Sequence, residues 1–208
     1  DVGAENIRSM NGKYSFSLRI KGEILDKIKL NVYGKHNIYN ALAAAAVAEY
    51  YGYDANLTVR GLQKFRGIRR RFELLGELNG AQMIADYAHH PREIAAALAT
   101  AKEVCGGKLF VIFQPHTYSR TRLLFDEFLQ VLQSVENLVI YKTYAAREYF
   151  DAKGSALTLS ESLPNSLYIE SLRQLQLYLQ CSLKSGDVAL FLGAGDIYFI
   201  AKRILDDK

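Results

Sequence analysis

Three runs of consecutive apolar residues constrain the fold of this chain more than any other feature of its sequence. They occupy residues 109–113, 138–141 and 188–192. An uninterrupted apolar strand is expected where helices cover both faces of a parallel sheet. Helical patterns alternate with these runs, over residues 92–103, 120–133, 171–183 and 197–205. The alternation predicts an α/β fold, a Rossmann-like and mainly parallel sheet with helices on both faces.

The first third of the chain carries a different pattern. Short strands are expected over residues 1–33, because residues 14–20 alternate apolar and polar side chains as a half-buried strand does. An alanine-rich helix over residues 38–48 and a second helix over residues 55–65 follow. This part is therefore expected to form a smaller α/β unit of its own.

The boundary between the two patterns is expected at Gly67, inside the arginine cluster of residues 66–71. We predict one domain at residues 1–66 and a second at residues 67–208. The second domain is expected to open with a hairpin that turns at Asn79-Gly80, a pair that favours a tight turn.

Composition excludes several classes of protein. Half of the 208 residues are hydrophobic and the net charge is only +4, which is typical of a folded chain. The arginine cluster lacks interleaved aromatic residues, so no nucleic-acid partner is expected. No apolar run approaches the roughly 18 residues of a membrane helix, so no membrane partner is expected, and no signal peptide is expected either. Two distant cysteines indicate reduced thiols and a cytoplasmic protein, and the start at Asp1 leads us to expect a fragment of a longer protein.

Four polar clusters follow the predicted strands. They occupy residues 86–91, 114–121, 144–148 and 193–196. Because ligands bind at the carboxyl edge of a parallel sheet, the clusters are expected to line one cleft. If the strands 82–85 and 109–113 are neighbours, His90 and Arg120 project over the same edge and can share one amino acid.

Each cluster also has a purely structural interpretation. Gly193-Ala194-Gly195-Asp196 is either an anion-binding turn or a packing turn, since the third glycine of a dinucleotide fingerprint is missing. The segment around His116 and Arg120 either binds an anionic group or begins a helix with a solvated arginine. His89 and His90 have no third ligand at suitable spacing, so no metal site is expected.

At these residues the sequence resembles the Mur ligases. The resemblance rests on six segments, in order: Gly-Lys-His-Asn-Ile-Tyr-Asn-Ala-Leu-Ala-Ala at 34–44, Arg-Arg-Phe-Glu at 70–73, Asp-Tyr-Ala-His-His-Pro at 86–91, Phe-Gln-Pro-His-Thr-Tyr-Ser-Arg-Thr at 113–121, Ala-Arg-Glu at 146–148 and Gly-Ala-Gly-Asp-Ile at 193–197. It implies that residues 1–66 are the end of the family's central ATP-binding domain. Residues 67–208 would form the C-terminal domain that binds the incoming amino acid.

The resemblance implies an ATP-dependent ligase that joins L-alanine to UDP-N-acetylmuramate through an acyl phosphate, in peptidoglycan synthesis. It implies ATP and Mg²⁺ as cofactors, with the metal ligands mainly outside this chain. The family's phosphate-binding loop is absent, since Tyr14 follows Lys13 where a Ser or Thr is needed, so this chain alone is expected to be inactive. The alternatives are a murein-peptide recycling ligase and a non-catalytic nucleotide-binding α/β module.

The family pattern also implies roles for individual residues. His36, Asn37 and Asn40 would lie at the adenine, Arg71 at the terminal phosphate and Asp86 at the ribose. His90, His116 and Arg120 would surround the amino acid as the catalytic group. A neutral histidine there would either accept the proton of the attacking ammonium or position the substrate, and the sequence leaves both open.

Overall fold

The computed structural model describes residues 1–207, with only the backbone of Asp26. Contacts divide the chain into two compact units, Asp1–Ile68 and Arg69–Lys208. The division falls two residues after the boundary that the sequence predicts.

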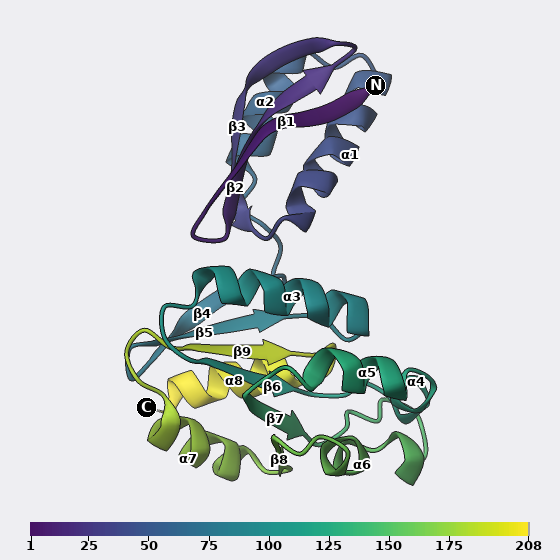
Figure 1. The fold of residues 1–208 in the computed structure, drawn as a ribbon, viewed down its shortest axis with the longest axis vertical. Helices are drawn as coiled ribbons and strands as arrows, with labels where there is room; N and C mark the ends of the chain where they lie inside the picture. The colour runs from purple at the N-terminus through teal and green to yellow at the C-terminus, as the bar shows by residue number, and fades with distance from the viewer. Residues whose placement is uncertain (208) are drawn as a thin grey trace. The chain divides into compact units, whose positions relative to one another are not determined.

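The first unit is an antiparallel sheet covered by two helices (Figure 1). Instead of short strands, it contains three long ones, β1 (Val2–Met10), β2 (Lys13–Ile20) and β3 (Glu23–Tyr33), followed by α1 (His36–Tyr50) and α2 (Ala55–Lys64). The alternating strand is confirmed, because every second residue of β2 is buried against the helices. Asn11 and Gly12 have positive φ and turn the chain between β1 and β2, so this segment is a hairpin turn.

The second unit is a six-stranded sheet with helices on both faces, which confirms the predicted fold class. Its strands are β4 (Glu73–Leu78), β5 (Ala81–Asp86), β6 (Leu109–Phe113), β7 (Asn137–Tyr141), β8 (Ser166–Ile169) and β9 (Val188–Leu192). Its helices are α3 (Pro91–Val104), α4 (Tyr118–Leu123), α5 (Phe125–Leu132), α6 (Ala156–Glu161), α7 (Leu172–Ser182) and α8 (Ile197–Asp206), with a short 3₁₀ helix η1 (Ala152–Gly154).

The strand order is β4-β5-β9-β6-β7-β8, and only β4 runs antiparallel to its neighbour. The last strand in sequence, β9, is therefore a central strand, with β5 on one side and β6 on the other. The premise that strands 82–85 and 109–113 are neighbours is wrong. Five consecutive buried residues allow β9 to take this place, since both of its faces lie in the core.

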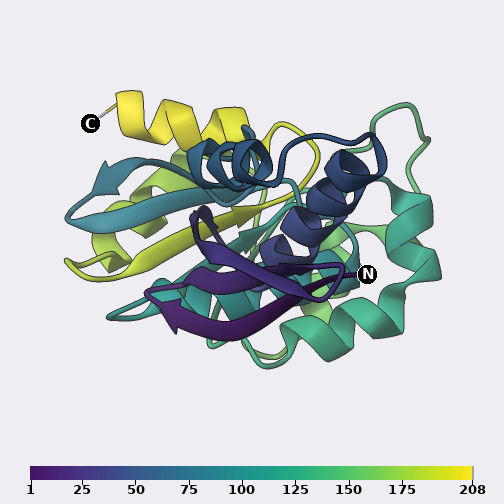
Figure 2. The same cartoon turned by 90° about the horizontal axis from the view of Figure 1, so that it is seen from above.

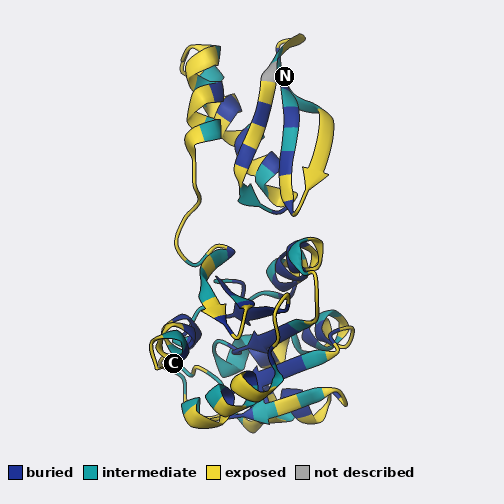
Figure 3. Cartoon of the chain, turned by 90° about the vertical axis from the view of Figure 1, so that its left-hand side faces the viewer, coloured by how far each residue is buried: buried dark blue, intermediate teal, exposed yellow. Residues whose placement is uncertain are grey.

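The two faces of the sheet pack on different helices, as Figures 1 and 2 show for α8 on one side and α5 on the other. Phe110 and Ile112 of β6 belong to the core beneath α7 and α8. Phe113 points to the opposite face, where its ring stacks on Phe128 of α5 at 5.4 Å. Burial on both faces makes the inner strands β5, β6, β7 and β9 the most buried part of the unit (Figure 3).

Two local features differ from the sequence prediction. The helix predicted over 120–133 is broken at Leu124, which ends α4 and precedes α5. The break follows from packing, because α4 lies against η1 while α5 lies against α3. The helix α6 has no counterpart among the predicted elements.

Candidate functional site

The carboxyl edge of the sheet brings the predicted polar clusters of the second unit together. The clusters follow β5, β6, β7 and β9, which run parallel. Gln114 Nε2 donates to Asp196 Oδ1 at 2.7 Å, and the backbone N–H of Thr117 donates to Tyr144 O at 2.9 Å. These bonds join segments that lie far apart in the sequence into one surface.

His116 and Arg120 form the centre of this surface. Arg120 Nη1 lies 3.2 Å from His116 Nδ1 and 3.2 Å from the His116 carbonyl oxygen. A guanidinium can only donate, so Nδ1 of His116 is the acceptor and the neutral ring carries its proton on Nε2. Burial, followed by the positive charge of Arg120, lowers the pKa of His116 below its usual value and favours this neutral form.

The two adjacent histidines have different environments. The His89 ring lies 6.1 Å from the His116 ring, and its Nδ1 is 2.9 Å from the Tyr87 carbonyl oxygen. Because a carbonyl only accepts, Nδ1 of His89 is the donor, and it also lies 3.5 Å from Glu93 Oε2. In the neutral form of this ring the lone pair is therefore on Nε2. His90 instead caps α3, where its Nδ1 accepts the Arg92 N–H at 3.3 Å. The geometry therefore directs His89, to which the sequence assigned no role, toward His116.

Glu93 fixes the turn that carries both histidines. Its Oε2 accepts the N–H groups of His89 at 3.0 Å and of His90 at 3.2 Å. Burial opposes the charge of Glu93, but the His89 N–H and the nearby His89 and Arg71 side chains outweigh it and lower the pKa of this carboxyl. The turn is thus held by an ionised carboxylate at the start of α3.

A second carboxylate holds the start of α4. Glu148, from the loop after β7, accepts both the N–H and the hydroxyl of Ser119. These bonds lower the pKa of Glu148. Thr117, at the N-cap, has a φ of 70°, which is strained for a β-branched residue. The loop after β7 therefore fixes the helix from which Arg120 projects.

Arg70 and Arg71 diverge at the start of the second unit. The Arg70 guanidinium is inserted 4.6 Å from the centroid of the Tyr87 ring, and its Nη2 donates to the Gly195 carbonyl oxygen at 2.8 Å. Arg71 remains exposed, with its guanidinium 5.6 Å from the centroid of the same ring. The arginine cluster is therefore not a continuous solvated surface.

Asp86 supports the same region. Its carboxylate accepts the N–H groups of Phe72 and Ala88, each at 2.8 Å. The first bond crosses from β5 to the residue before β4. Asp86 thus anchors the chain that leads from Arg71 into the sheet, and this role is separate from the ribose contact expected from the sequence.

The other predicted nucleotide contacts lie in the first unit, at the start of α1. Asn37 Nδ2 donates to the Tyr33 carbonyl oxygen at 2.6 Å, and Asn37 Oδ1 accepts from Asn40 Nδ2 at 2.9 Å. His36 and Asn40 are exposed. Two linked amides at a helix start offer donors and acceptors of the kind that an adenine edge requires.

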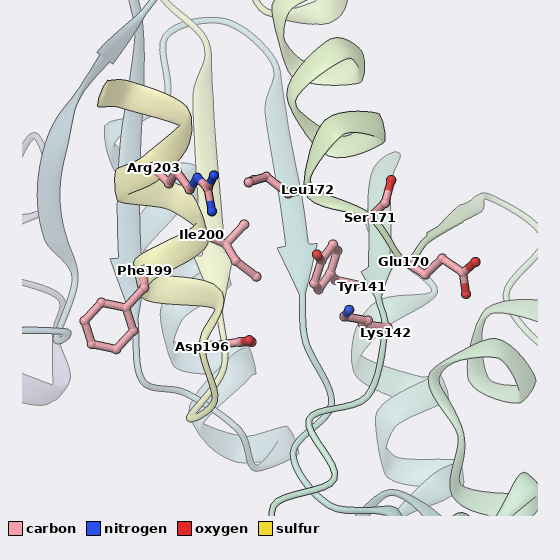
Figure 4. Close-up of a pocket in the computed structure, with 9 residues that line it drawn as sticks. All are labelled: Tyr141, Lys142, Glu170, Ser171, Leu172, Asp196, Phe199, Ile200 and Arg203. Carbon is pink, nitrogen blue, oxygen red and sulfur yellow. The ribbon is translucent and has the colours of Figure 1, made fainter. Parts of the chain in front are cut away.

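A groove of about 450 Å³ lies beside α7 and α8 (Figure 4). It is lined by Tyr141, Lys142, Glu170, Ser171, Leu172, Asp196, Phe199, Ile200 and Arg203. Of the predicted clusters, only the one at residues 193–196 reaches it, through Asp196. The groove is therefore distinct from the surface around His116 and Arg120.

Among residues 1–207, no group of three His, Cys, Asp or Glu side chains is placed to hold a metal ion. None of the described helices is both long and apolar enough to cross a bilayer.

The fold and the site define a Rossmann-like α/β domain whose carboxyl edge presents imidazole and guanidinium groups. Residues 70–195 match the family model described as the Mur ligase, glutamate ligase domain. This match covers more than half of the chain, so the chain belongs to the Mur ligase family.

Known members of this family resemble the chain over almost its whole length. It is 39% identical to the UDP-N-acetylmuramate–L-alanine ligase of Alkaliphilus metalliredigens, over 99% of this chain and 45% of that protein. It is 42% identical to the ligase of the same name from Caldicellulosiruptor bescii, over 95% of this chain and 44% of that protein. The crystal structure of the UDP-N-acetylmuramate-alanine ligase MurC from Thermotoga maritima superposes with a TM-score of 0.80 at 30% identity, over 99% of this chain and 45% of that one. The chain thus spans less than half the length of the relatives that it matches.

Proposed function

We propose that this chain is part of an ATP-dependent ligase that joins L-alanine to UDP-N-acetylmuramate in peptidoglycan synthesis. Support comes from membership of the Mur ligase family and from curated relatives that bear the name of this activity. The observation that carries the proposal is the cluster of Arg120, neutral His116 and His89 at the carboxyl edge.

The cluster is suited to an α-amino acid, which carries an anionic and a cationic group a few ångströms apart. Arg120 has five N–H donors, and those not directed at His116 are available to a carboxylate. The Nε2–H of His116 is a second donor. The lone pair on Nε2 of His89 is an acceptor for the ammonium and for the proton that it loses on attack.

The chemistry that this cluster would serve is amide formation. A carboxylate is a poor electrophile, and ATP with Mg²⁺ supplies the phosphoryl group that converts it to an acyl phosphate. The residues of this chain would hold the amine in line with the activated carbonyl and take up its proton. We propose this acyl-phosphate route because it is the one that the family resemblance implies.

The nucleotide contacts are part of the same proposal. His36, Asn37 and Asn40 of the first unit are proposed to face the adenine, in keeping with the linked amides at the start of α1. In the second unit, Arg71 is proposed to reach the terminal phosphate and Asp86 the ribose. The exposed guanidinium of Arg71 supports the first of these two roles.

Substitution of Arg120 in the whole protein tests the proposal. Arg120→Lys keeps the charge but loses the planar fork, so KM for L-alanine should rise about tenfold or more with little change in KM for ATP. Arg122→Lys is the matched control, because Arg122 is exposed on the same helix and pairs with Asp151. Equal effects of the two substitutions would contradict the assignment of Arg120.

The choice of substrate separates this function from its alternatives. Phosphate release by the whole protein should require ATP, UDP-N-acetylmuramate and L-alanine together. Release that requires a murein peptide in place of L-alanine would identify a recycling ligase. The chain of residues 1–208 alone should release no phosphate, because Asn11 and Gly12 form a hairpin turn and Tyr14 follows Lys13.

A further inference from the structure

The Gly193-Ala194-Gly195-Asp196 segment has no role in the proposed function so far. Several of its polar groups bond within the protein. Gln114 Oε1 accepts the first N–H of α8, from Ile197, at 3.1 Å, and Gln114 Nε2 donates to Asp196. The Gly195 carbonyl accepts from Arg70. The N–H of Ile197, which an anion-binding turn would leave available, is thus taken by Gln114, and these bonds favour a packing turn. The need for Gly195 then has another origin.

Gly195 is required for space. A Cβ atom at Gly195 would lie 2.6 Å from Cγ and 2.7 Å from Cβ of Tyr144, and 2.5 Å from Gln114 Oε1. At Gly193 the backbone itself also disfavours a side chain, because its φ is 149°. At Gly195 only the lack of space does so. The absent side chain at Gly195 therefore lets Tyr144 lie directly on the turn between β9 and α8.

Tyr144 in turn lies on His116. The two rings are stacked, with centroids 5.4 Å apart and planes 21° apart. The backbone fixes this pairing from both sides of His116, since Tyr144 N–H donates to the Pro115 carbonyl and Tyr144 O accepts the Thr117 N–H, each at 2.9 Å. One face of the imidazole is thus covered, while its edge carries the bond to Arg120.

We propose that Tyr144, seated on Gly195, is a positioning residue that holds the His116 ring with Nδ1 toward Arg120 and the Nε2–H toward the amino-acid site. Without the stacked ring, the imidazole can rotate about its Cβ–Cγ bond, which exchanges the positions of Nδ1 and Cδ2. Nδ1 then no longer faces Arg120, so the neutral ring is free to carry its proton on either nitrogen. The significance for catalysis rests on the proposed function, whereas the orientation of the ring does not. Contact is made through the ring of Tyr144, so its hydroxyl is not required.

The orientation can be tested by the nitrogen-15 chemical shifts of the imidazoles, which distinguish protonated from unprotonated ring nitrogens. The 208-residue chain has only four histidines, so His116 can be assigned by substitution. In the unaltered chain and in Tyr144→Phe, His116 should be a single tautomer with the proton on Nε2. Tyr144→Ala should give a mixture of both tautomers, and Tyr144 is exposed enough for this variant to fold.

Gly195→Ala should have the same effect as Tyr144→Ala, because it displaces the tyrosine ring. Gly106→Ala is its matched control, since a Cβ atom there would meet only the Gly186 carbonyl at 3.9 Å. In the whole protein, Tyr144→Ala should lower kcat about tenfold or more with KM for ATP unchanged, and Tyr144→Phe should restore it.

An Nε2–H tautomer that persists in Tyr144→Ala would overturn the proposal, as would unchanged kcat in that variant of an active ligase. A different outcome is that Tyr144→Ala gives mixed tautomers while the unaltered whole protein shows no L-alanine-dependent phosphate release. This outcome would overturn the proposed function alone. The orientation of His116 by Tyr144 would then stand.

Discussion

Two adjacent histidines on one turn serve different purposes because Pro91 follows the second of them. Proline is favoured at the first position of a helix, so the residue before it is the N-cap. His90 therefore directs its ring at the backbone of α3, while His89 lies toward His116. The sequence carried this signal, and it could have assigned the site to His89 before the structure was known.

Replacement of His89 should lower kcat, whereas replacement of His90 should not. His89→Gln in the whole protein should lower kcat by roughly 10²-fold, as expected for loss of a proton acceptor. His90→Asn retains a good N-cap and should leave kcat nearly unchanged. Steady-state kinetics with L-alanine as the varied substrate would measure both. A large loss in His90→Asn together with full activity in His89→Gln would reverse the assignment.

The environment of His116 predicts how stability depends on pH. Its folded-state pKa lies below the ordinary value of 6.5, so the unfolded chain binds a proton more readily. The free energy of unfolding should therefore be highest above about pH 6.5 and fall as the pH is lowered toward the folded-state pKa. Burial lowers this pKa most, the positive charge of Arg120 and the nearby His89 side chain lower it further, and Glu148 opposes them.

Urea titrations of the chain between pH 7.5 and 5 would measure this effect. His116→Gln should flatten the dependence in that interval. The pKa values of the Glu93 and Glu148 carboxyls are also lowered, so these groups change the free energy of unfolding only below their ordinary pKa of 4.5. They therefore do not contribute between pH 7.5 and 5. An identical slope in the variant would show that His116 does not carry the effect.

At the scale of single elements, α4 depends on segments outside itself. It has only six residues, too few to be stable alone, and no side-chain cap of its own. Glu148 supplies the missing cap from the loop after β7. Gly154 of η1 has no room for a side chain because the backbone of Tyr118 lies against it.

Removal of this distant cap should destabilise the second unit. Glu148→Ala is expected to lower the free energy of unfolding by about 1 kcal/mol, as for loss of an N-cap. Glu161→Ala is a control, since Glu161 is exposed at the end of α6. Equal stability of Glu148→Ala and the unaltered chain in denaturant titrations would argue against a capping role.

The elements predicted well from sequence are those whose signal is local. The apolar runs of β6, β7 and β9 and the Asn79-Gly80 turn each specify their structure within a few residues. The break at Leu124 and the helix α6 were missed because they follow from packing against η1, α3 and the sheet. Such contacts join residues that lie far apart in the sequence.

At the scale of the whole molecule, the start of the second unit carries two adjacent arginines with different environments. Arg70 is bound between Tyr87 and Tyr198 and to the Gly195 carbonyl. Arg71 is exposed. The sequence placed both in one basic cluster, since nothing local distinguishes a guanidinium that packs between aromatic rings from one that faces solvent.

Substitution should separate these two roles. Arg71→Ala in the whole protein is expected to lower kcat by roughly 10²-fold, as for loss of one contact to transition-state charge, with little change in thermal stability. Arg70→Ala should instead lower the melting temperature, because it removes the contacts of a half-buried guanidinium with Tyr87, Tyr198 and the Gly195 carbonyl. Thermal unfolding and steady-state kinetics on both variants would measure this. A purely thermal effect of Arg71→Ala would make that residue a solvated part of the junction.

The strand order has a consequence for how the second unit is made. Its central strand, β9, is the last of its six strands to leave the ribosome, and β5 and β6 pair with β9 but not with each other. While the intervening residues are being synthesised, two buried strands therefore carry unpaired edges and exposed apolar faces. Closure of this sheet must follow translation of residues 188–192, so we expect the incomplete domain to be more prone to aggregation than the finished one.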